Sequence, residues 1–237
     1  MPLETAIVTS PSELPEIGAL DYVGWQTPYN PQLKHFRPSF SSREEAIKWY
    51  IIDRTTLLQE GNPKITFIKA IDTEIGMILG YALWEYNDLA SEGSTGAIQA
   101  LWHPEGSDER EFAERFVNGL WGFIGKRVTR PHMDLLGIVV HPDHRKRGAG
   151  RLLIRWGIDK ADELGIETVV SSLQSAVGAY EKSGLGAIEV IPPDPSLKVE
   201  SPSEKWKELQ QDDLSGVLMW RPIGHDYVKG VDKAPWL

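Results

Sequence analysis

One stretch of this chain constrains its fold more than any other: an apolar run, a basic turn with two glycines and an amphipathic segment follow one another directly. The run 135–140 is typical of a buried strand, and the apolar residues from Leu152 to Ile158 recur near helical spacing. Gly148 and Gly150 allow a tight turn and a close approach of ligand to backbone. The first amides of a helix lack intrahelical acceptors and lie at the positive end of its dipole. The stretch therefore predicts an anion cradle suited to phosphate or pyrophosphate.

The sequence of the turn narrows the choice of ligand. It lacks the Lys-Ser/Thr pair that ends a P-loop, and it lacks the third glycine of a dinucleotide-binding motif. The pattern R-x-x-G-x-G at 145–150, which follows V-x-H-P at 139–142, instead resembles motif A of the GCN5-related N-acetyltransferase (GNAT) family. The resemblance implies that the turn holds the pyrophosphate of acetyl-coenzyme A (acetyl-CoA). The alternative is a helix start that binds no ligand.

The cofactor-binding residues implied by the resemblance fall into two groups. Backbone amides of the turn would surround the pyrophosphate, and its basic side chains would add positive potential; without the resemblance, these charges indicate only a solvated basic turn. The preceding strand would line the pantetheine arm and splay from its neighbour, which leaves the Ile138 N–H to polarise the thioester carbonyl. The full set is Ile138, Val139, Val140, Arg145, Lys146, Arg147, Gly148, Ala149, Gly150 and Arg151.

Acetyl transfer from a thioester to an amine also needs an acid that protonates the departing thiolate. The segment 176–185 resembles the family element A-x-x-L-Y-x-x-x-G-F, which makes Tyr180 the candidate acid. A phenol suits this role because the pKa values of a free thiol and a phenol differ by only ~1.5 units. Two positions depart from the family pattern, since Ala179 replaces the usual leucine and Leu173 replaces an asparagine. The alternative is a core tyrosine on a short helix.

The amine must lose a proton before it attacks, because an alkylammonium has a pKa near ~10.4. Asp134 lies eleven residues before Arg145, the spacing of the glutamate base in the histone-acetylating branch of the family. Glu85, at the end of an earlier candidate strand, is a rival base, and His132 is a weaker one. Each of the three can instead be a strand-end residue that faces solvent.

An irregular, aromatic segment at 24–40 is the candidate acceptor site. In the family, the segment between the first two helices commonly forms part of that site. A loop rich in rings and prolines either packs on the core or lines a pocket, and both interpretations stay open. The candidate substrate-binding residues are Trp25, Tyr29, Phe36 and, on a later strand, Trp84.

The chain predicts a single GNAT-type domain over 1–237, with a mixed α/β sheet of six or seven strands flanked by helices. Family-specific motifs span 133–185, an insertion covers 87–127 and a C-terminal extension covers 192–237. Strands are expected at 3–9, 64–71, 75–86, 133–140, 168–173, 187–191 and 216–221, and helices at 12–23, 42–61, 109–127, 149–165 and 175–183. The charged run from Pro192 to Asp213 is expected to be a surface excursion.

Composition limits the partners. The net charge of −9 argues against a nucleic-acid binder, and no apolar run approaches the ~18 residues of a membrane span. The chain has no cysteine, which excludes disulfides, cysteine–zinc sites and a cysteine acyl-enzyme. His141 and His144 are the only histidines at close spacing, and they flank a turn, so we expect no metal. The N-terminal residues lack the pattern of a signal peptide, and we expect a cytoplasmic protein, with the nucleus as the alternative.

Together these features predict an enzyme that moves an acetyl group from acetyl-CoA directly to a primary amine of a small molecule. No covalent enzyme intermediate is expected, and the enzyme would act as a monomer or homodimer. Two alternatives stay open: acetylation of a protein lysine or N-terminus, and a non-catalytic module that binds acyl-CoA.

Overall fold

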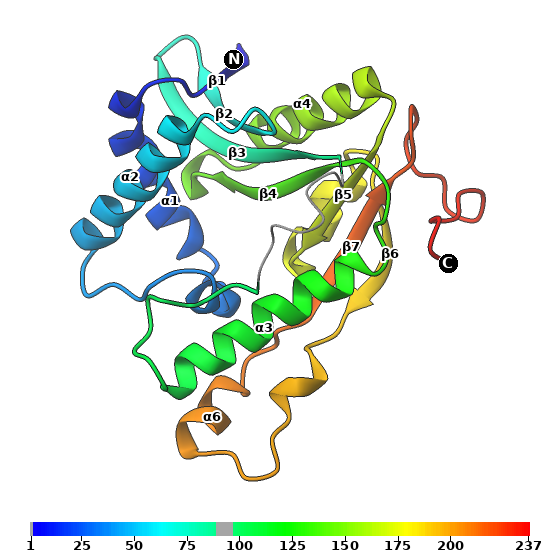
Figure 1. The fold of residues 1–237 in the computed structure, drawn as a ribbon. Coiled ribbons are helices and arrows are strands. Elements are labelled where there is room, and N and C mark those ends of the chain that lie inside the picture. Colours follow the sequence, from blue (N-terminus) through cyan, green and yellow to red (C-terminus); the bar gives the residue numbers. More distant parts are fainter. Residues whose placement is uncertain (1, 89–96) are drawn as a thin grey trace.

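A computed structural model of the chain describes residues 2–88 and 97–237 and is built on one seven-stranded sheet (Figure 1). The strand order is β1-β2-β3-β4-β5-β7-β6. All neighbours are antiparallel except β4 and β5, which are parallel. The strands are β1 (Leu3–Ile7), β2 (Ile65–Asp72), β3 (Met77–Asn87), β4 (His132–Val140), β5 (Glu167–Ser172), β6 (Gly186–Ile191) and β7 (Gly216–Arg221). The expected mixed sheet is confirmed.

Helices cover both faces of this sheet. The α-helices are α1 (Leu14–Trp25), α2 (Arg43–Glu60), α3 (Asp108–Gly125), α4 (Ala149–Leu164), α5 (Val177–Glu181) and α6 (Glu204–Leu209). Short 3-10 helices are η1 (Pro11–Glu13), η2 (Pro31–His35), η3 (Pro142–His144), η4 (Gln174–Ala176) and η5 (Pro195–Leu197). On one face, α1 and α2 pack over β2–β4, while α3 packs over the β5–β7 half. The opposite face is covered by α4 and α5.

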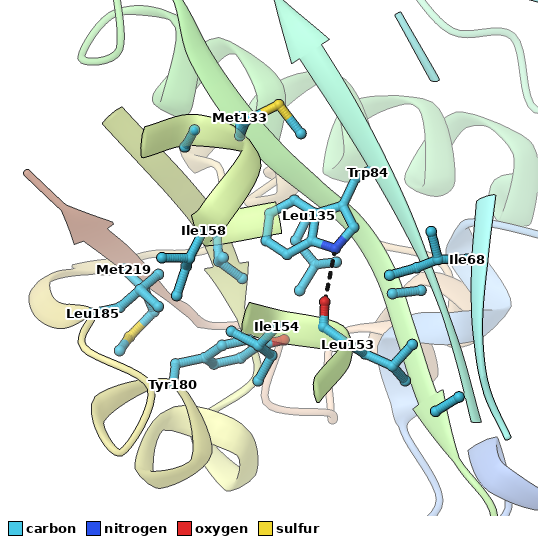
Figure 2. Close-up of a cluster of buried hydrophobic side chains, with 14 of the residues drawn as sticks. Ile68, Trp84, Met133, Leu135, Leu153, Ile154, Ile158, Tyr180, Leu185 and Met219 are labelled. Atoms are coloured by element: carbon cyan, nitrogen blue, oxygen red, sulfur yellow. Dashed lines mark hydrogen bonds between the residues drawn. The ribbon is translucent and has the colours of Figure 1, made fainter. Parts of the chain in front are cut away.

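The core between α4 and the sheet is centred on Trp84, which is fully buried. Its indole Nε1–H donates to the carbonyl oxygen of Leu153 on α4 at 3.1 Å (Figure 2). A Cβ at Gly157 would lie 2.2 Å from this indole ring, so α4 carries a glycine where the helix meets the ring. This contact fixes the position of α4, and hence of its first turn, relative to β3.

The parallel strands β4 and β5 part after a short paired segment. Within the described residues, their register runs only from His132–Glu167 to Asp134–Val169, after which β4 continues to Val140 beside β3 alone. An irregularity in the β3–β4 register leaves Leu136 without a residue opposite it, and such bulges bend the strand that carries them. The splayed strand pair expected from the family resemblance is therefore present. We call the space between the two diverging strands the opening.

The expectation of a surface excursion over 192–213 is wrong. This segment forms η5 and α6, and its few apolar side chains are buried against α3. The buried residues are Leu197, Trp206 and Leu209, which pack with Phe112 and Phe116. Trp206 also donates its Nε1–H to the carbonyl oxygen of Leu197 at 2.9 Å. The surrounding charges, which suggested a solvated segment, lie on the outer side of a small second core.

The expected insertion at 87–127 contains α3 and the segment before it. Its glycine- and serine-rich part at 89–96 lies outside the described residues. The following segment, 97–107, has no helix or strand and packs on α3, where the Asn118 and Glu114 side chains accept hydrogen bonds from the Ile98 and Ala100 amides at 2.9 and 3.0 Å. The chain after β7 is irregular, as expected, and its Trp236 packs against Trp220.

Candidate active site

The turn before α4 has the backbone geometry of an anion cradle. Gly148 caps the helix with a left-handed φ of 102°, a conformation that strains any residue with a Cβ. Lys146 is also left-handed, with a φ of 63°. Within the described part of the chain, the amides of Gly148, Ala149 and Gly150 donate to no acceptor. These amides at a helix N-terminus can therefore bind an anion.

The two arginines of the turn bind to the protein on either side of it. The Arg145 guanidinium donates to the carbonyl oxygens of Val140 at 3.2 Å, of Gly24 at 3.0 Å and of Thr27. Arg147 donates to the buried Asp72 carboxylate at 2.5 Å and contacts His144 Nδ1 at 2.8 Å. Both side chains thus hold the turn in place.

The remaining basic residues of the turn, Lys146 and Arg151, are exposed at its surface. They lie in sequence on either side of the three free amides. The positive side chains that can reach an anion in the cradle are therefore these two, and the predicted group of basic ligands divides into a structural pair and an exposed pair.

The part of β4 that was predicted to bind the cofactor comprises Ile138, Val139 and Val140. The amide of His141 donates to the carbonyl oxygen of Leu79 on β3 at 2.9 Å. Because backbone groups alternate in direction along a strand, the Val139 N–H points to β3 and the Ile138 N–H points the other way. The Ile138 amide therefore faces the opening, which is what polarisation of a bound carbonyl would need.

Tyr180 lies on α5 beside the core under α4, next to Ile154, Leu185 and Met219 (Figure 2). Its side chain is 5% exposed and makes no hydrogen bond within the described residues. Burial raises the pKa of Tyr180 above its ordinary value, and the Asp134 carboxylate raises it further. The phenol is therefore neutral and can donate its proton.

Two candidate bases, Asp134 and Glu85, lie directly opposite each other on β4 and β3. Met133 and Leu135, which flank Asp134 on β4, point into the core under α4. Because side chains alternate along a strand, Asp134 points to the other face, beside the opening. Burial raises the pKa of Asp134 to about 7, and the Glu85 carboxylate contributes to the rise. Burial also raises the pKa of Glu85, although His132 and Lys64 oppose that rise. Asp134 thus titrates near neutral pH beside a second carboxyl group.

The weaker candidate, His132, lies two residues from Asp134 on the same face of β4. Burial lowers its pKa, and its Nδ1 lies 2.8 Å from the carbonyl oxygen of Arg130. That contact makes Nδ1 the protonated nitrogen of a neutral imidazole. His132 is therefore a neutral neighbour of the carboxylate pair.

The predicted substrate-binding residues are dispersed. Trp84 is fully buried on the α4 side of β3, so no part of it remains for a substrate to contact. Trp25 is half-buried and donates its Nε1–H to Asp21 at 2.9 Å. Tyr29 is 58% exposed, and Phe36 packs edge-on against Phe116 of α3 with ring centroids 5.7 Å apart.

Segment 24–40 is accordingly part core and part surface. His35 is buried between Phe112 and Phe116, and burial lowers its pKa to about 4.

Sequence analysis missed Asp21, which is buried on α1 and accepts hydrogen bonds from Trp25, from Arg37 at 2.6 Å and from the Tyr81 hydroxyl at 2.5 Å. A carboxylate on an otherwise apolar helix face, four residues before a tryptophan, is the signal that could have indicated it.

Comparison with known proteins agrees with this geometry. A model of the acetyltransferase (GNAT) family matches residues 29–185, about two thirds of the chain. This range includes all of the site residues predicted from the sequence except Trp25. The chain belongs to the GNAT family. This GNAT protein is thus an acetyltransferase. A search of the curated proteins finds no match.

Solved GNAT structures share the fold. A histone acetyltransferase HPA2-related protein from Corynebacterium glutamicum is 17% identical, with a TM-score of 0.57 over 96% of this chain and 100% of that one. A mosquito arylalkylamine N-acetyltransferase-like protein is 12% identical, with a TM-score of 0.57 over 92% and 99%. A phosphinothricin acetyltransferase from Sinorhizobium meliloti, in complex with acetyl-CoA, is 14% identical, with a TM-score of 0.51 over 100% and 98%. At these identities the likeness shows the fold alone.

The residues present fit acetyl-CoA. Three free helix amides and two exposed basic side chains suit its pyrophosphate, and the opening beside Ile138 suits an extended arm that needs a backbone partner. Across the described residues, no three histidine, aspartate or glutamate side chains gather in a way that could hold a metal ion. No helix there has the length and apolar character needed to span a membrane.

Proposed function

We propose that this GNAT acetyltransferase transfers the acetyl group of acetyl-CoA directly to a primary amine of a small molecule. The observation that carries the proposal is the pair of facing carboxylates, Asp134 and Glu85, beside the opening and near the neutral phenol of Tyr180. A base with a pKa near neutrality and an un-ionised acid are the two groups that the transfer needs.

Each residue has a distinct role in this mechanism. Acetyl-CoA supplies the acetyl group as an activated thioester. The amides of Gly148, Ala149 and Gly150 hold the pyrophosphate, and the Ile138 N–H donates to the carbonyl oxygen as negative charge develops there. The Asp134 carboxylate accepts the proton of the incoming ammonium, directly or through water. Tyr180 donates its phenolic proton to the departing sulfur.

The composition of the chain supports the proposal of direct transfer. A thioester acyl-enzyme would need a cysteine nucleophile, and the chain has none. The proposed role of Glu85 is to keep the Asp134 pKa high, since a like charge across the strand disfavours a second ionisation. The mechanism requires no metal, nucleic acid or membrane.

The segments that lie over the sheet face carrying Asp134 and Glu85 favour a small acceptor. Segments 24–40 and 97–107 both pack on α3, and we propose that they border the acceptor site and enclose a small acceptor. Two of the structural relatives bear the names of small-molecule acetyltransferases. Acetylation of a protein amine is the second candidate, favoured by the spacing of Asp134 from the cradle.

The test is release of CoA thiol from acetyl-CoA over two panels of acceptors, small primary amines and lysine-containing or N-terminal peptides. We expect kcat/KM for the best small amine to exceed that for the best peptide by about a hundredfold or more, because an enclosed site cannot admit a peptide backbone. A peptide that outperforms every small amine would reject the small-molecule proposal and select the second candidate. A Tyr180→Phe variant run in parallel shows that thiol release comes from this site.

A further inference from the structure

We propose that Arg145 is a positioning residue that couples the cofactor cradle to the acceptor segment 24–40. Its side chain does not extend to the surface of the cradle, although it belongs to the R-x-x-G-x-G turn. It instead joins three backbone carbonyls, one at the end of β4 and two where α1 passes into the acceptor segment. The inference rests on the proposed function only in treating segment 24–40 as a wall of the acceptor site.

The backbone of Arg145 is fixed as firmly as its side chain. Its amide donates to the carbonyl oxygen of Pro142 at 3.3 Å, which closes η3 immediately before the left-handed Lys146. One residue thus spans the turn that holds the pyrophosphate, the end of β4 that lines the opening, and the first residues of the acceptor wall. Any shift of the turn moves the guanidinium and the carbonyls bound to it.

Direct packing between α1 and β4 supports the same junction. A Cβ at Gly24 would lie 2.1 Å from Val139 Cγ1, so the last turn of α1 rests directly on the Val139 side chain of β4. The Gly24 carbonyl that Arg145 binds belongs to this contact. The hydrogen bonds therefore tie together two elements that already pack directly against each other.

The other end of the acceptor segment is anchored far from the cradle. Gln32 donates its side-chain amide to the Ser215 carbonyl oxygen at 2.9 Å, and Lys34 pairs with Asp212 at 2.6 Å. Between that anchor and Arg145 lies Tyr29, exposed and free to meet a ligand. The wall is therefore anchored at the cofactor cradle by Arg145 as well as at contacts distant from it.

Coupling of this kind works in both directions. Acetyl-CoA held by the turn restricts Arg145, which restricts the first residues of the wall, and an acceptor that orders the wall stabilises the turn in return. We expect acetyl-CoA alone to slow amide hydrogen exchange over 24–36 by about tenfold, within the usual range of coupling between two sites.

The experiment compares amide exchange, with and without saturating acetyl-CoA and with no amine present, in the parent protein and in three variants. Arg145→Met removes all three hydrogen bonds, and Arg145→Lys keeps the charge with a single point donor. Arg155→Met is the matched control, since this arginine is exposed on α4 and, among the described residues, its ion-pair partners are all acidic residues of that helix. Melting curves of each variant establish that it is folded.

In Arg145→Met we expect acetyl-CoA still to protect the amides at 146–151 while protection over 24–36 is lost, with Arg145→Lys intermediate and the control like the parent. Once an acceptor is known, Arg145→Met should raise the KM for that acceptor about tenfold with little change in kcat.

Full protection of 24–36 in Arg145→Met would overturn the proposal. Loss of protection at 146–151 would also overturn it, because Arg145 would then be a cofactor ligand. These results need no amine, so they stand apart from the choice of acceptor. If Arg145→Met does not fold, Arg145→Lys decides by the same criteria.

Discussion

Replacement of Asp134 by asparagine should make the protein more stable and nearly inactive. The carboxyl has an ordinary pKa of 3.8, and burial beside Glu85 raises its pKa to about 7 in the folded state. At ~1.36 kcal/mol per pKa unit, that gap corresponds to roughly 4 kcal/mol, an upper limit on the cost of holding the ionised carboxylate in this position. Asparagine fills the same volume and carries no charge to desolvate.

The sign of this effect follows from proton binding. Between about pH 4 and pH 7 the folded state holds the proton and the unfolded state does not, so this contribution to stability is complete below pH 4 and is lost as pH rises to 7. Catalysis has the opposite dependence, because the base must be ionised. Activity should therefore rise with pH up to about 7, where the stabilisation by the proton has disappeared.

The assay pairs pH–rate profiles with melting curves at pH 5 and pH 8. We expect Asp134→Asn to lose about 10²- to 10⁴-fold in kcat. Its melting temperature should exceed that of the parent at pH 8 by up to about 10 °C, and by much less at pH 5. Asp159→Asn, on the exposed face of α4, is the control and should change neither quantity appreciably. An Asp134→Asn protein that is destabilised at pH 8, or that keeps the alkaline rise in activity, would refute the reasoning and shift the base to Glu85.

Three further substitutions test other parts of the structure. Tyr180→Phe should lower kcat about 10²-fold or more while the Kd for acetyl-CoA, measured by calorimetry, stays the same; a matching loss of affinity would make the phenol a binding group. Gly148→Glu should abolish the thermal stabilisation of about 2.7 kcal/mol that acetyl-CoA at a hundred times its Kd gives the parent, because it strains a φ of 102° and puts an anion in the cradle. Gly157→Ala should cost about 1–3 kcal/mol in urea unfolding, since its Cβ would overlap Trp84, whereas Gly122→Ala, with open space on α3, should be neutral or stabilising. Equal effects of the two alanines would contradict the packing described for α4.

Sequence periodicity was sufficient to predict the main helices and strands, because each of them is determined by residues close together in the sequence. Ser42 caps α2 by accepting from the Glu45 amide at 3.1 Å, and Gly61 ends the helix with a φ of 58°. The strand, turn and helix around Gly148 were likewise predictable from apolar spacing and two glycines. Such features depend on residues within a few positions of one another, which is the range that a sequence displays directly.

The direction in which each side chain points was harder to predict from the sequence, because it depends on contacts between residues that are distant in the sequence. Trp84 was placed at the acceptor site, yet it points into the core because the strand alternates and Glu85 occupies the other face. The arginines of the turn were assigned to pyrophosphate by their charge. In the structure Arg147 pairs with Asp72, 75 residues earlier in the chain, and Arg145 donates to Thr27, 118 residues earlier. Helix α6 was missed because Trp206 and Leu209 are too few to show a period within a charged run.

The point where β4 and β5 part also divides the molecule mechanically. In the part of the chain that the structure describes, the half-sheet β1–β4 pairs with the half-sheet β5–β7 through three residue pairs, from His132–Glu167 to Asp134–Val169. The core under α4 reinforces this junction. Such a seam separates two cooperative units, and sub-global opening across it should need less free energy than unfolding of either unit. In the proposed mechanism, the acetyl donor would lie in this gap and bond to the free edge of β4. It would then join the two halves of the sheet mechanically in each catalytic cycle and leave them separate once it is released.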